Sequence, residues 1–488
     1  MNLKKILNFC NGSVLILLCI LMADCCITGA GRVLMVDPFS LRMIIFALTL
    51  ILSVPIIFTS FNKLIKNPFM WAVYGFILWI AIEAVIGIVN GNSHSLIITD
   101  LKGFAYFAIL PVAICVLSDK KRIHTLMKVM MYSSTALAII TILHLIIYLY
   151  FKDTFNTLYL YELENNVSMF SAVSTQIPRL FFKSSAYLFV GITFATYFQI
   201  KEKKINLLYG AITGICLFCI VLTYTRSLFL AAALAAITLI VGVLISITKD
   251  KRALFLKHMI AAVVSLFVVL SVFAVVGKTD YLRYAITRTV ITFENNEPDQ
   301  QPSQPTSTSQ STSGTITTTQ SPSVSGSSAP VTESTQPPST TVPSTTVPST
   351  STQATTSPSD LYDQATKDSD NLRGTIIAEL LKMIKRSPII GNGLGAAIEW
   401  RESNEYFYLD LTAKTGIIGF ILYLLPAALI LIKTIRNRKK SLDKVLLTTV
   451  WFSPLVGFMA FSFFNPYMNA SLGILYYCCV MGSDSANT

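Results

Sequence analysis

Charged residues are scarce in this sequence. Only 13% of its 488 residues are Asp, Glu, Lys or Arg, whereas about a quarter of the residues in a soluble globular protein are charged. Hydrophobic residues make up 53% of the chain, and the mean hydropathy is +0.61. This composition excludes an ordinary soluble domain and indicates a protein that lies in a membrane.

Metal-ligand spacings are also lacking. Cys216 and Cys219 have the CxxC spacing, but they lie within an apolar run, where cysteine acts as a small hydrophobic residue. None of the histidines lies three or four residues before a carboxylate; these histidines are His94, His124, His144 and His258. The sequence therefore predicts neither a metal site nor a cofactor.

Apolar runs of about 20 residues recur along the chain, and each is long enough to cross a hydrocarbon core of about 30 Å. Because backbone polar groups need partners in lipid, continuous runs of this length are typical of helices and not of barrel strands. The sequence predicts an all-α polytopic membrane protein with about 12 transmembrane helices, the first retained and not cleaved as a signal peptide. The predicted spans are 11–30, 40–60, 69–90, 96–117, 125–150, 181–200, 205–223, 227–247, 254–276, 415–433, 445–464 and 468–482.

Lysine and arginine are distributed unevenly between the two sides of these spans. Alternate junctions carry Lys63 and Lys66, then "DKKR" (119–122), "KEKK" (201–204), "KDKR" (249–252) and "KTIRNRKK" (433–440), whereas loops 31–39 and 91–95 have almost none. Basic loops stay in the cytoplasm, so both termini are predicted to be cytoplasmic in a multi-pass protein of the cell membrane. The net charge of +12 is thus explained by topology and by attraction to membrane lipid, and no basic stripe indicates a nucleic acid.

A long segment separates spans nine and ten, and the topology places it outside the cell. It divides the chain into helices 1–9 (1–277), an extracytoplasmic loop (278–412) and helices 10–12 (413–488). Residues 298–359 are almost entirely Ser, Thr, Pro and Gln, a composition that predicts disorder. This tract is either a flexible tether or a mucin-like acceptor of O-linked sugar, and the apolar spacing in 371–412 predicts an ordered basic helix followed by a glycine turn.

Several cations break the rule that positive residues lie inside. They are Lys102, Arg179, Arg226, Arg288, Arg373 and Arg401, all predicted at or beyond the outer ends of the spans. One interpretation is that they reach lipid headgroups or form surface salt bridges. The other is that they converge on a phosphate or pyrophosphate, because a guanidinium group binds phosphate oxygens in a bidentate manner.

Three stretches are similar to motifs of the O-antigen ligase and polymerase (Wzy-type) superfamily. They are "LTYTRSLFLAAALA" (222–235), "LRGTIIAELLKMIKRSPIIGNGLG" (372–395) and "EYFYLDLTAKTGIIGFILYLL" (405–425), with a weaker likeness in "PRLFFKSSAYLFVGITFA" (178–195). Counted back from Gly416 without gaps, the histidine of the family falls on Glu405 and its asparagine on Tyr406. A shift of two residues would place this pair on Ser403 and Asn404 instead.

The resemblance implies glycosyl transfer at the outer membrane face. A polyprenyl-pyrophosphate-linked glycan would be the donor, and a hydroxyl group of a glycan, lipid or protein would be the acceptor. Preplaced cations would stabilise the leaving pyrophosphate without a metal, and a carboxylate would take the acceptor proton. The implied catalytic residues are Glu405 as base, with Glu402 and Asp410 as rivals, and Arg226 and Arg373 on the pyrophosphate; the implied substrate-binding residues are Lys102, Arg179, Arg288, Arg401, Glu402 and Asn404.

Other functions fit parts of the sequence. A transporter or flippase of lipid-linked sugars would place charges at mid-membrane in two related halves, and no internal repeat is found. A surface stalk that presents the Ser/Thr tract would not need twelve spans. Within the enzyme class, ligase, polymerase and protein O-oligosaccharyltransferase all remain open.

Overall fold

A computed structural model describes residues 3–29, 35–36, 39–164, 167, 171–174, 177–202, 204–247, 249–275, 358–401, 405–437 and 441–485. The predicted tether 298–359 lies outside this part of the chain except for its last two residues. Whether it is a tether or an acceptor of sugar therefore stays a prediction, as does the division at 277 and 412.

The described chain is built almost entirely from helices, joined in two places by very short antiparallel hairpins. The hairpins are β1 (Met35–Val36) with β2 (Phe39–Ser40), and β3 (Ser171–Ser174) with β4 (Ile177–Arg179). The helices are α1 (Leu3–Thr28), α2 (Leu41–Thr59), α3 (Phe61–Ile65), α4 (Pro68–Val89), α5 (His94–Phe104), η1 (Ala105–Ile109), α6 (Leu110–Val116), α7 (Lys120–Tyr150), α8 (Lys152–Glu164), η2 (Ser185–Tyr187), α9 (Leu188–Lys201), α10 (Leu207–Leu222), α11 (Arg226–Ser246), α12 (Lys249–Val275), α14 (Pro358–Arg386), α15 (Phe407–Asn437), α16 (Leu442–Phe461) and α17 (Ser471–Ser485).

Within the described residues, nine helical segments are long and apolar enough to cross a membrane: α1, α2, α4, α5–α6, α7, α11, α12, α15 and α16. This confirms the all-helical polytopic class. The other three predicted spans coincide with α9, α10 and α17, which have only 14 to 16 residues. At about 1.5 Å per residue these helices are shorter than a hydrocarbon core of about 30 Å, so the count of twelve stays a prediction.

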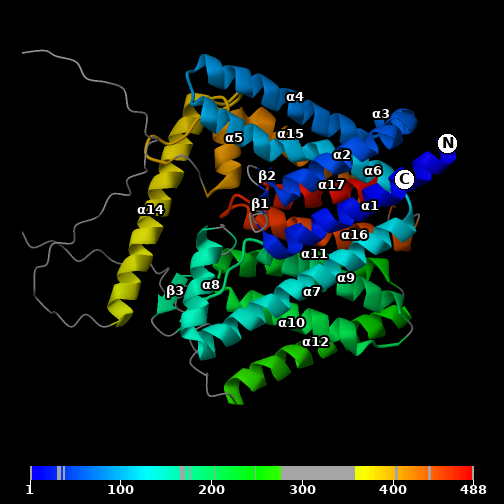
Figure 1. Ribbon diagram of the computed structural model, residues 1–488, viewed down its shortest axis with the longest axis vertical. Coiled ribbons are helices and arrows are strands. Elements are labelled where there is room, and N and C mark those ends of the chain that lie inside the picture. Colours follow the sequence, from blue (N-terminus) through cyan, green and yellow to red (C-terminus); the bar gives the residue numbers. More distant parts are fainter. Residues whose placement is uncertain are drawn as a thin grey trace, which may run out of the picture.

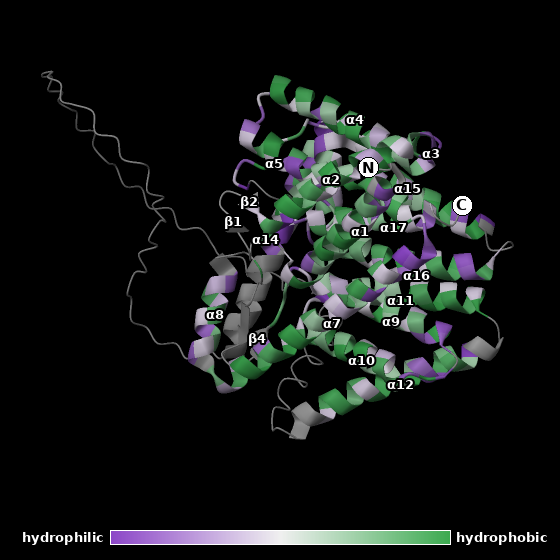
Figure 2. Ribbon diagram, turned by 45° about the vertical axis from the view of Figure 1, so that its right-hand side comes forward, coloured by the Kyte–Doolittle hydropathy of each residue, from purple (hydrophilic) through white to green (hydrophobic). Residues whose placement is uncertain are grey.

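The long helices run side by side, and α14 crosses one end of the bundle together with α8 and β3 (Figure 1). The chain begins in α1 and ends in α17 at the opposite end (Figure 1). Hydrophobic residues follow the lengths of the helices, while hydrophilic ones gather at places such as α3 (Figure 2). We call the two ends of the bundle the α14 end and the terminal end.

Two element boundaries differ from the sequence prediction. The ordered flank predicted from residue 371 begins at Pro358, and proline is favoured in the first turn of a helix. The span predicted from residue 415 begins at Phe407, and the helix is broken at Gly416 (φ 64°, ψ −174°). Polar residues before Gly416 hid the first two turns of α15 from a hydropathy window.

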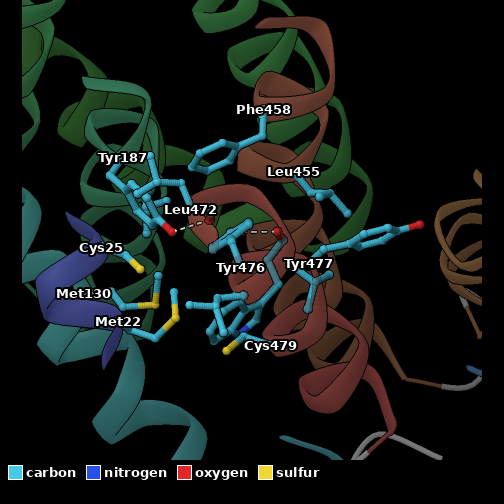
Figure 3. Packing of buried hydrophobic residues seen from close by; sticks show 14 of the residues in the cluster. Met22, Cys25, Met130, Tyr187, Leu455, Phe458, Leu472, Tyr476, Tyr477 and Cys479 are labelled. Carbon is cyan, nitrogen blue, oxygen red and sulfur yellow. Dashed lines mark hydrogen bonds between the residues drawn. The ribbon is translucent and has the colours of Figure 1, made fainter. Parts of the chain in front are cut away.

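The centre of the bundle is an aromatic and sulfur-rich core. Tyr187 lies edge-on to Phe458 at 5.0 Å between ring centroids, beside Cys25 and the methionines of α1 and α7 (Figure 3). The buried hydroxyl of Tyr187 donates to the carbonyl of Leu472 (2.6 Å), and that of Tyr476 donates to the carbonyl of Trp451 (2.9 Å). Each tyrosine thus fills apolar volume and satisfies its hydroxyl group on a backbone carbonyl.

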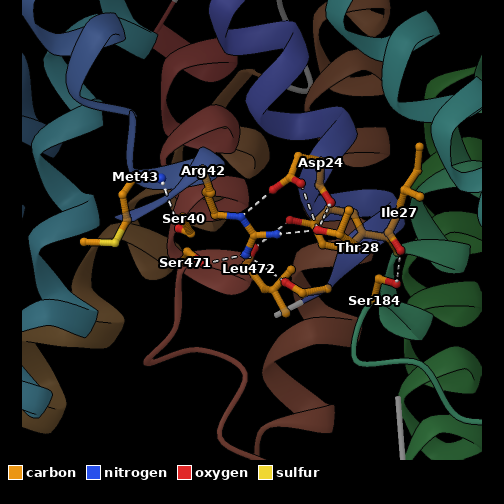
Figure 4. Close-up of polar contacts among 11 residues, drawn as sticks. Asp24, Ile27, Thr28, Ser40, Arg42, Met43, Ser184, Ser471 and Leu472 are labelled. Atoms are coloured by element: carbon orange, nitrogen blue, oxygen red, sulfur yellow. Dashed lines mark hydrogen bonds and ion pairs between the residues drawn. The ribbon is translucent and has the colours of Figure 1, made fainter. Parts of the chain in front are cut away.

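A buried arginine joins α1, α2 and α17. Arg42 is 2% exposed, and its Nε lies 2.6 Å from Oδ2 of Asp24 (Figure 4). Its Nη1 donates to the carbonyl of Gly29 (2.7 Å) and to Oγ of Ser471 (2.9 Å). Nη2 donates to the hydroxyl of Thr28 (3.1 Å). The sequence prediction missed this network, although an Asp and an Arg within apolar runs are the signal for one.

We expect Asp24→Asn to destabilise the bundle by about 3–5 kcal/mol, because it leaves the Arg42 guanidinium buried without its counter-charge. All nine cysteines are buried, so a thiol-reactive maleimide dye reports unfolding of the detergent-solubilised protein as they become exposed. The control is Asp443→Asn. The side chain of Asp443 is 70% exposed and forms an ion pair with Lys201. The control should cost at most about 1 kcal/mol; equal shifts in the two variants would contradict a buried ion pair at Arg42.

Candidate functional site

The residues after α14 form a turn that only glycine can make. Gly391, Gly393 and Gly395 have φ values of +104°, +84° and +75°. A Cβ on Gly391 would lie 2.4 Å from the carbonyl oxygen of Lys414, and one on Gly393 would lie 2.4 Å from the amide of Gly87. We call residues 391–395 the glycine turn; it lies in direct backbone contact with α4 and α15.

The glycine turn exchanges hydrogen bonds with the break in α15. In a continuous helix the amides of Ile417 and Ile418 would donate to the carbonyls of Ala413 and Lys414. They donate instead to Pro388 (2.9 Å) and Ile389 (3.4 Å) in the segment leading to the turn. The vacated carbonyls accept from the amides of Asn392 and Gly393, both at 3.0 Å. The break at Gly416 therefore leaves these amides and carbonyls paired and fixes the turn to the helix.

Two further amides attach the turn to the neighbouring helices. Leu394 N–H donates to the backbone carbonyl of Glu83 on α4 (2.9 Å), and Gly395 N–H donates to Oδ2 of Asp100 on α5 (2.9 Å). The same Asp100 binds Lys414 of α15, Nζ to Oδ1 at 2.9 Å, and Lys414 also binds Asp410 at 2.9 Å. Asp100, Asp410 and Lys414, which we call the lysine triad, tie α5 and α15 together beneath the turn.

A small apolar cluster sets α14 against the start of α15. Ile376 and Leu380 of α14 are buried with Ile398, Tyr406 and Ala413. Ile376 and Leu380 are one helical turn apart, so they give α14 one apolar face. The contact places the first turn of α15 next to the middle of α14.

This packing brings three predicted site residues together. Oε1 of Glu405 lies 2.9 Å from Nη2 of Arg401, and its Oε2 lies 3.9 Å from Nε of Arg373. The side chains are accessible, at 41% for Glu405, 24% for Arg401 and 52% for Arg373. These residues, the arginine–glutamate cluster, place one carboxylate between two guanidinium groups at the α14 end of the bundle.

Arg226 is presented separately, at the first residue of α11. It is exposed and follows Tyr224, whose φ of +45° is strained for a residue with a side chain. The next residue, Ser227, accepts a hydrogen bond from Nδ2 of Asn465 (3.3 Å). The turn between α10 and α11 thus places Arg226 at the start of the helix, but no hydrogen bond or ion pair among the described residues joins it to the arginine–glutamate cluster.

The other predicted site residues lie outside the arginine–glutamate cluster or outside the described residues. Arg179 lies in β4, whose partner strand β3 packs against α14, and the amide of Leu180 donates to the carbonyl of Leu222 at the end of α10 (3.4 Å). Lys102 is exposed on α5, two residues after Asp100 of the lysine triad. Of the rival bases, Asp410 is buried on Lys414 and not available to a substrate in this arrangement. Arg288, Glu402 and Asn404 lie outside the described residues.

One family comparison fits this geometry. Residues 211–424 match the family model described as O-antigen ligase. This match supports the O-antigen ligase/polymerase superfamily for residues 211–424. The matched region contains Arg226, Arg373, Arg401 and Glu405 and ends just past the middle of α15. No curated protein and no solved structure matches the chain.

The chain also carries residues near the glycine turn that the sequence prediction did not assign to the site. Asp100 and Lys414 organise the turn, and Glu83 lies buried beside it. The available signal was the presence of ionisable side chains within apolar runs, which are functional candidates by default. Across the described residues no group of three or more His, Cys, Asp and Glu side chains is arranged to hold a metal ion.

We expect Gly393→Ala to loosen the turn and to lower the activity of the protein. A left-handed conformation costs about 1–2 kcal/mol for alanine, and the Cβ would also collide with the Gly87 backbone. The matched control is Gly374→Ala on α14, where nothing lies within 4 Å and alanine should favour the helix. Thermal unfolding followed by the maleimide dye, together with surface polysaccharide made in cells, measures both effects; an unfolding temperature equal to that of the control would contradict the close backbone approach.

Proposed function

We propose that this membrane glycosyltransferase moves a glycan from a polyprenyl-pyrophosphate carrier to an acceptor hydroxyl at the α14 end of the bundle. The observation that carries the proposal is the arginine–glutamate cluster, which presents a carboxylate and two guanidinium groups on one accessible site. A base and a pyrophosphate-binding group are the two elements that this transfer requires.

The distribution of charge supports an external α14 end. Lys63 and Lys66 lie in and directly after α3, and "DKKR" (119–122) caps and begins α7, both at the terminal end of the bundle. Basic residues near spans mark the cytoplasmic side, so both termini are assigned to the cytoplasm. The cluster then faces the outside, where a lipid-linked glycan exposes its sugar.

The guanidinium groups suit a pyrophosphate. Arg373 and Arg401 contribute two positive charges and Glu405 one negative charge, so the cluster has a net charge of +1 before substrate binds. Pyrophosphate oxygens would attract the two arginines away from the carboxylate and bind them in a bidentate manner. As the sugar–oxygen bond breaks, negative charge gathers on the leaving pyrophosphate, and the arginines stabilise it in place of a metal ion.

Glu405 is then free to act as the base. The acceptor oxygen attacks the anomeric carbon of the donor sugar while the bond from that carbon to the pyrophosphate oxygen breaks. The acceptor proton passes to Glu405, and the electron pair of the broken bond leaves with polyprenyl pyrophosphate. The 2.9 Å contact with Arg401 sets the direction of the carboxylate before the acceptor arrives.

Arg226 is assigned a supporting role on the same pyrophosphate, with Lys102, Arg179 and Arg288 around the donor. The turn before α11 supports this role, since it places an exposed cation at the first residue of that helix, at the α14 end. Glu402 and Asn404 are proposed to contact the acceptor. Ligase and polymerase differ only in that acceptor, and the segment 298–357 would act as a tether outside the transfer site.

Arg373→Ala should lower transfer by about 10²-fold or more, because it removes a group that binds developing charge. The matched control is Lys382→Ala, a cation on the same helix that pairs with Glu379 and not with the cluster. Surface polysaccharide is measured in cells that carry each variant as the only copy, with protein level checked by immunoblot. Normal polysaccharide from Arg373→Ala at equal protein level would rule out the pyrophosphate assignment.

Glu405→Gln should reduce turnover by about 10²–10⁴-fold, because the amide keeps the shape but cannot accept the proton. The KM for donor should change little, since the arginines remain. Glu405→Asp, which keeps a shorter carboxylate, should retain part of the activity. A Gln variant as active as the wild type would show that the base lies elsewhere.

A further inference from the structure

Among the buried acids of the described chain, Glu83 is the one without a cationic or histidine partner. Glu83 lies on α4 at 0% exposure, and neither carboxyl oxygen makes a hydrogen bond of good geometry within the described residues. The polar group that interacts with its carboxyl group is the backbone N–H of Gly393 in the glycine turn, which donates to the carbonyl of Lys414. The other buried or nearly buried acids have a cationic or histidine partner: Asp24 with Arg42, Glu162 with His144, Asp100 and Asp410 with Lys414, and Asp484 with Lys433. The fold thus provides a counter-charge for these acids and none for Glu83.

The position of Glu83 couples it to the glycine turn. One turn earlier on α4, Trp79 donates through Nε1 to the carbonyl of Thr415 (2.9 Å). One turn later, Gly87 lies so close to Leu394 that a Cβ would be 2.2 Å from its carbonyl oxygen. Residues four apart share a helix face, so Glu83 lies on the face that packs against the break in α15 and the glycine turn. Its own carbonyl accepts the amide of Leu394.

No neighbouring charge compensates an ionised Glu83. The charged and titratable groups on the elements packed against this part of α4 are His94, Asp100 and Lys102 of α5 and Tyr408, Asp410, Lys414 and Tyr423 of α15. The two tyrosine hydroxyls donate to the carbonyls of Met459 and Met468, and His94 is exposed. Asp100, Asp410 and Lys414 are bound to one another, and Lys102 is exposed. The glycine turn carries no charge. A carboxylate without a partner at this depth would be very costly, whereas the uncharged acid is tolerated.

We propose that Glu83 is a proton-binding site, whose carboxyl group is held as the uncharged acid while the glycine turn is docked against α4. Proton binding and docking then favour each other, because each is stronger when the other is present. Docking is complete at low pH, where Glu83 is protonated in both states, and weakens as the pH rises and the undocked, hydrated form loses its proton. This inference concerns the turn and does not depend on the proposed glycosyl transfer.

An apolar carbodiimide tests the protonation directly. Dicyclohexylcarbodiimide reacts with protonated carboxyl groups in apolar surroundings: the O–H adds across a C=N bond and the acyl group then migrates to nitrogen, so the whole reagent is retained and nothing leaves. With the full chain in lipid nanodiscs, peptide mass analysis should find an adduct on Glu83 and none on Asp24, Asp410 or Asp484. The adduct should be absent in Glu83→Gln. No adduct on Glu83, or equal labelling of the paired acids, would overturn the proposal.

Hydrogen exchange of the peptide spanning the glycine turn tests the coupling. In the wild type, protection corrected for the intrinsic exchange rate should fall as the pH rises from mildly acidic to mildly alkaline. Glu83→Gln keeps the uncharged shape and should protect the turn equally at both pH values. Glu379→Gln, which changes an exposed acid paired with Lys382, should behave as the wild type. Equal protection of the wild-type turn at both pH values would overturn the coupling.

Discussion

The cost of removing a charge from water organises this bundle. Ionisable side chains are few, and several of those that are buried join different helices: Lys414 binds Asp100 over 314 residues, and Lys433 binds Asp484 over 51. Packing these helices in another order would leave a buried charge unpaired, which costs more than most lost apolar contacts. Lipid does not distinguish one apolar helix face from another, so these pairs add the specificity that hydrophobicity alone does not supply.

Hydropathy could predict the helical class and the approximate spans because both depend on local composition. It could not predict which helices are neighbours, because contacts such as that between α11 and α16 join residues about two hundred positions apart. It also missed the start of α15, where Asp410 and Lys414 look like loop residues until their partners are known. In the folded chain they neutralise each other, and the helix begins eight residues earlier than the apolar run.

The site was partly predictable for a related reason. Resemblance to a family pointed to Arg373, Arg401 and Glu405, and these three side chains do meet. The support beneath them was not foreseen, since an exchange of backbone hydrogen bonds between the glycine turn and the break at Gly416 has no side-chain signature except glycine itself. The role of Asp100 could not be predicted, because the sequence does not show that Lys414 is its partner.

The two groups of charges at the α14 end differ in burial, and this difference suits different tasks. The lysine triad is buried and closely bonded, so exchanging its partners would require desolvated charges to separate. The arginine–glutamate cluster is accessible, and its contact to Arg373 is long at 3.9 Å, so that pair contributes little to stability. A weak, hydrated ion pair can be replaced by a phosphate at small cost, while the turn beneath it stays fixed. A rigid support under exchangeable charges is the arrangement that proposed binding and release of a pyrophosphate would require.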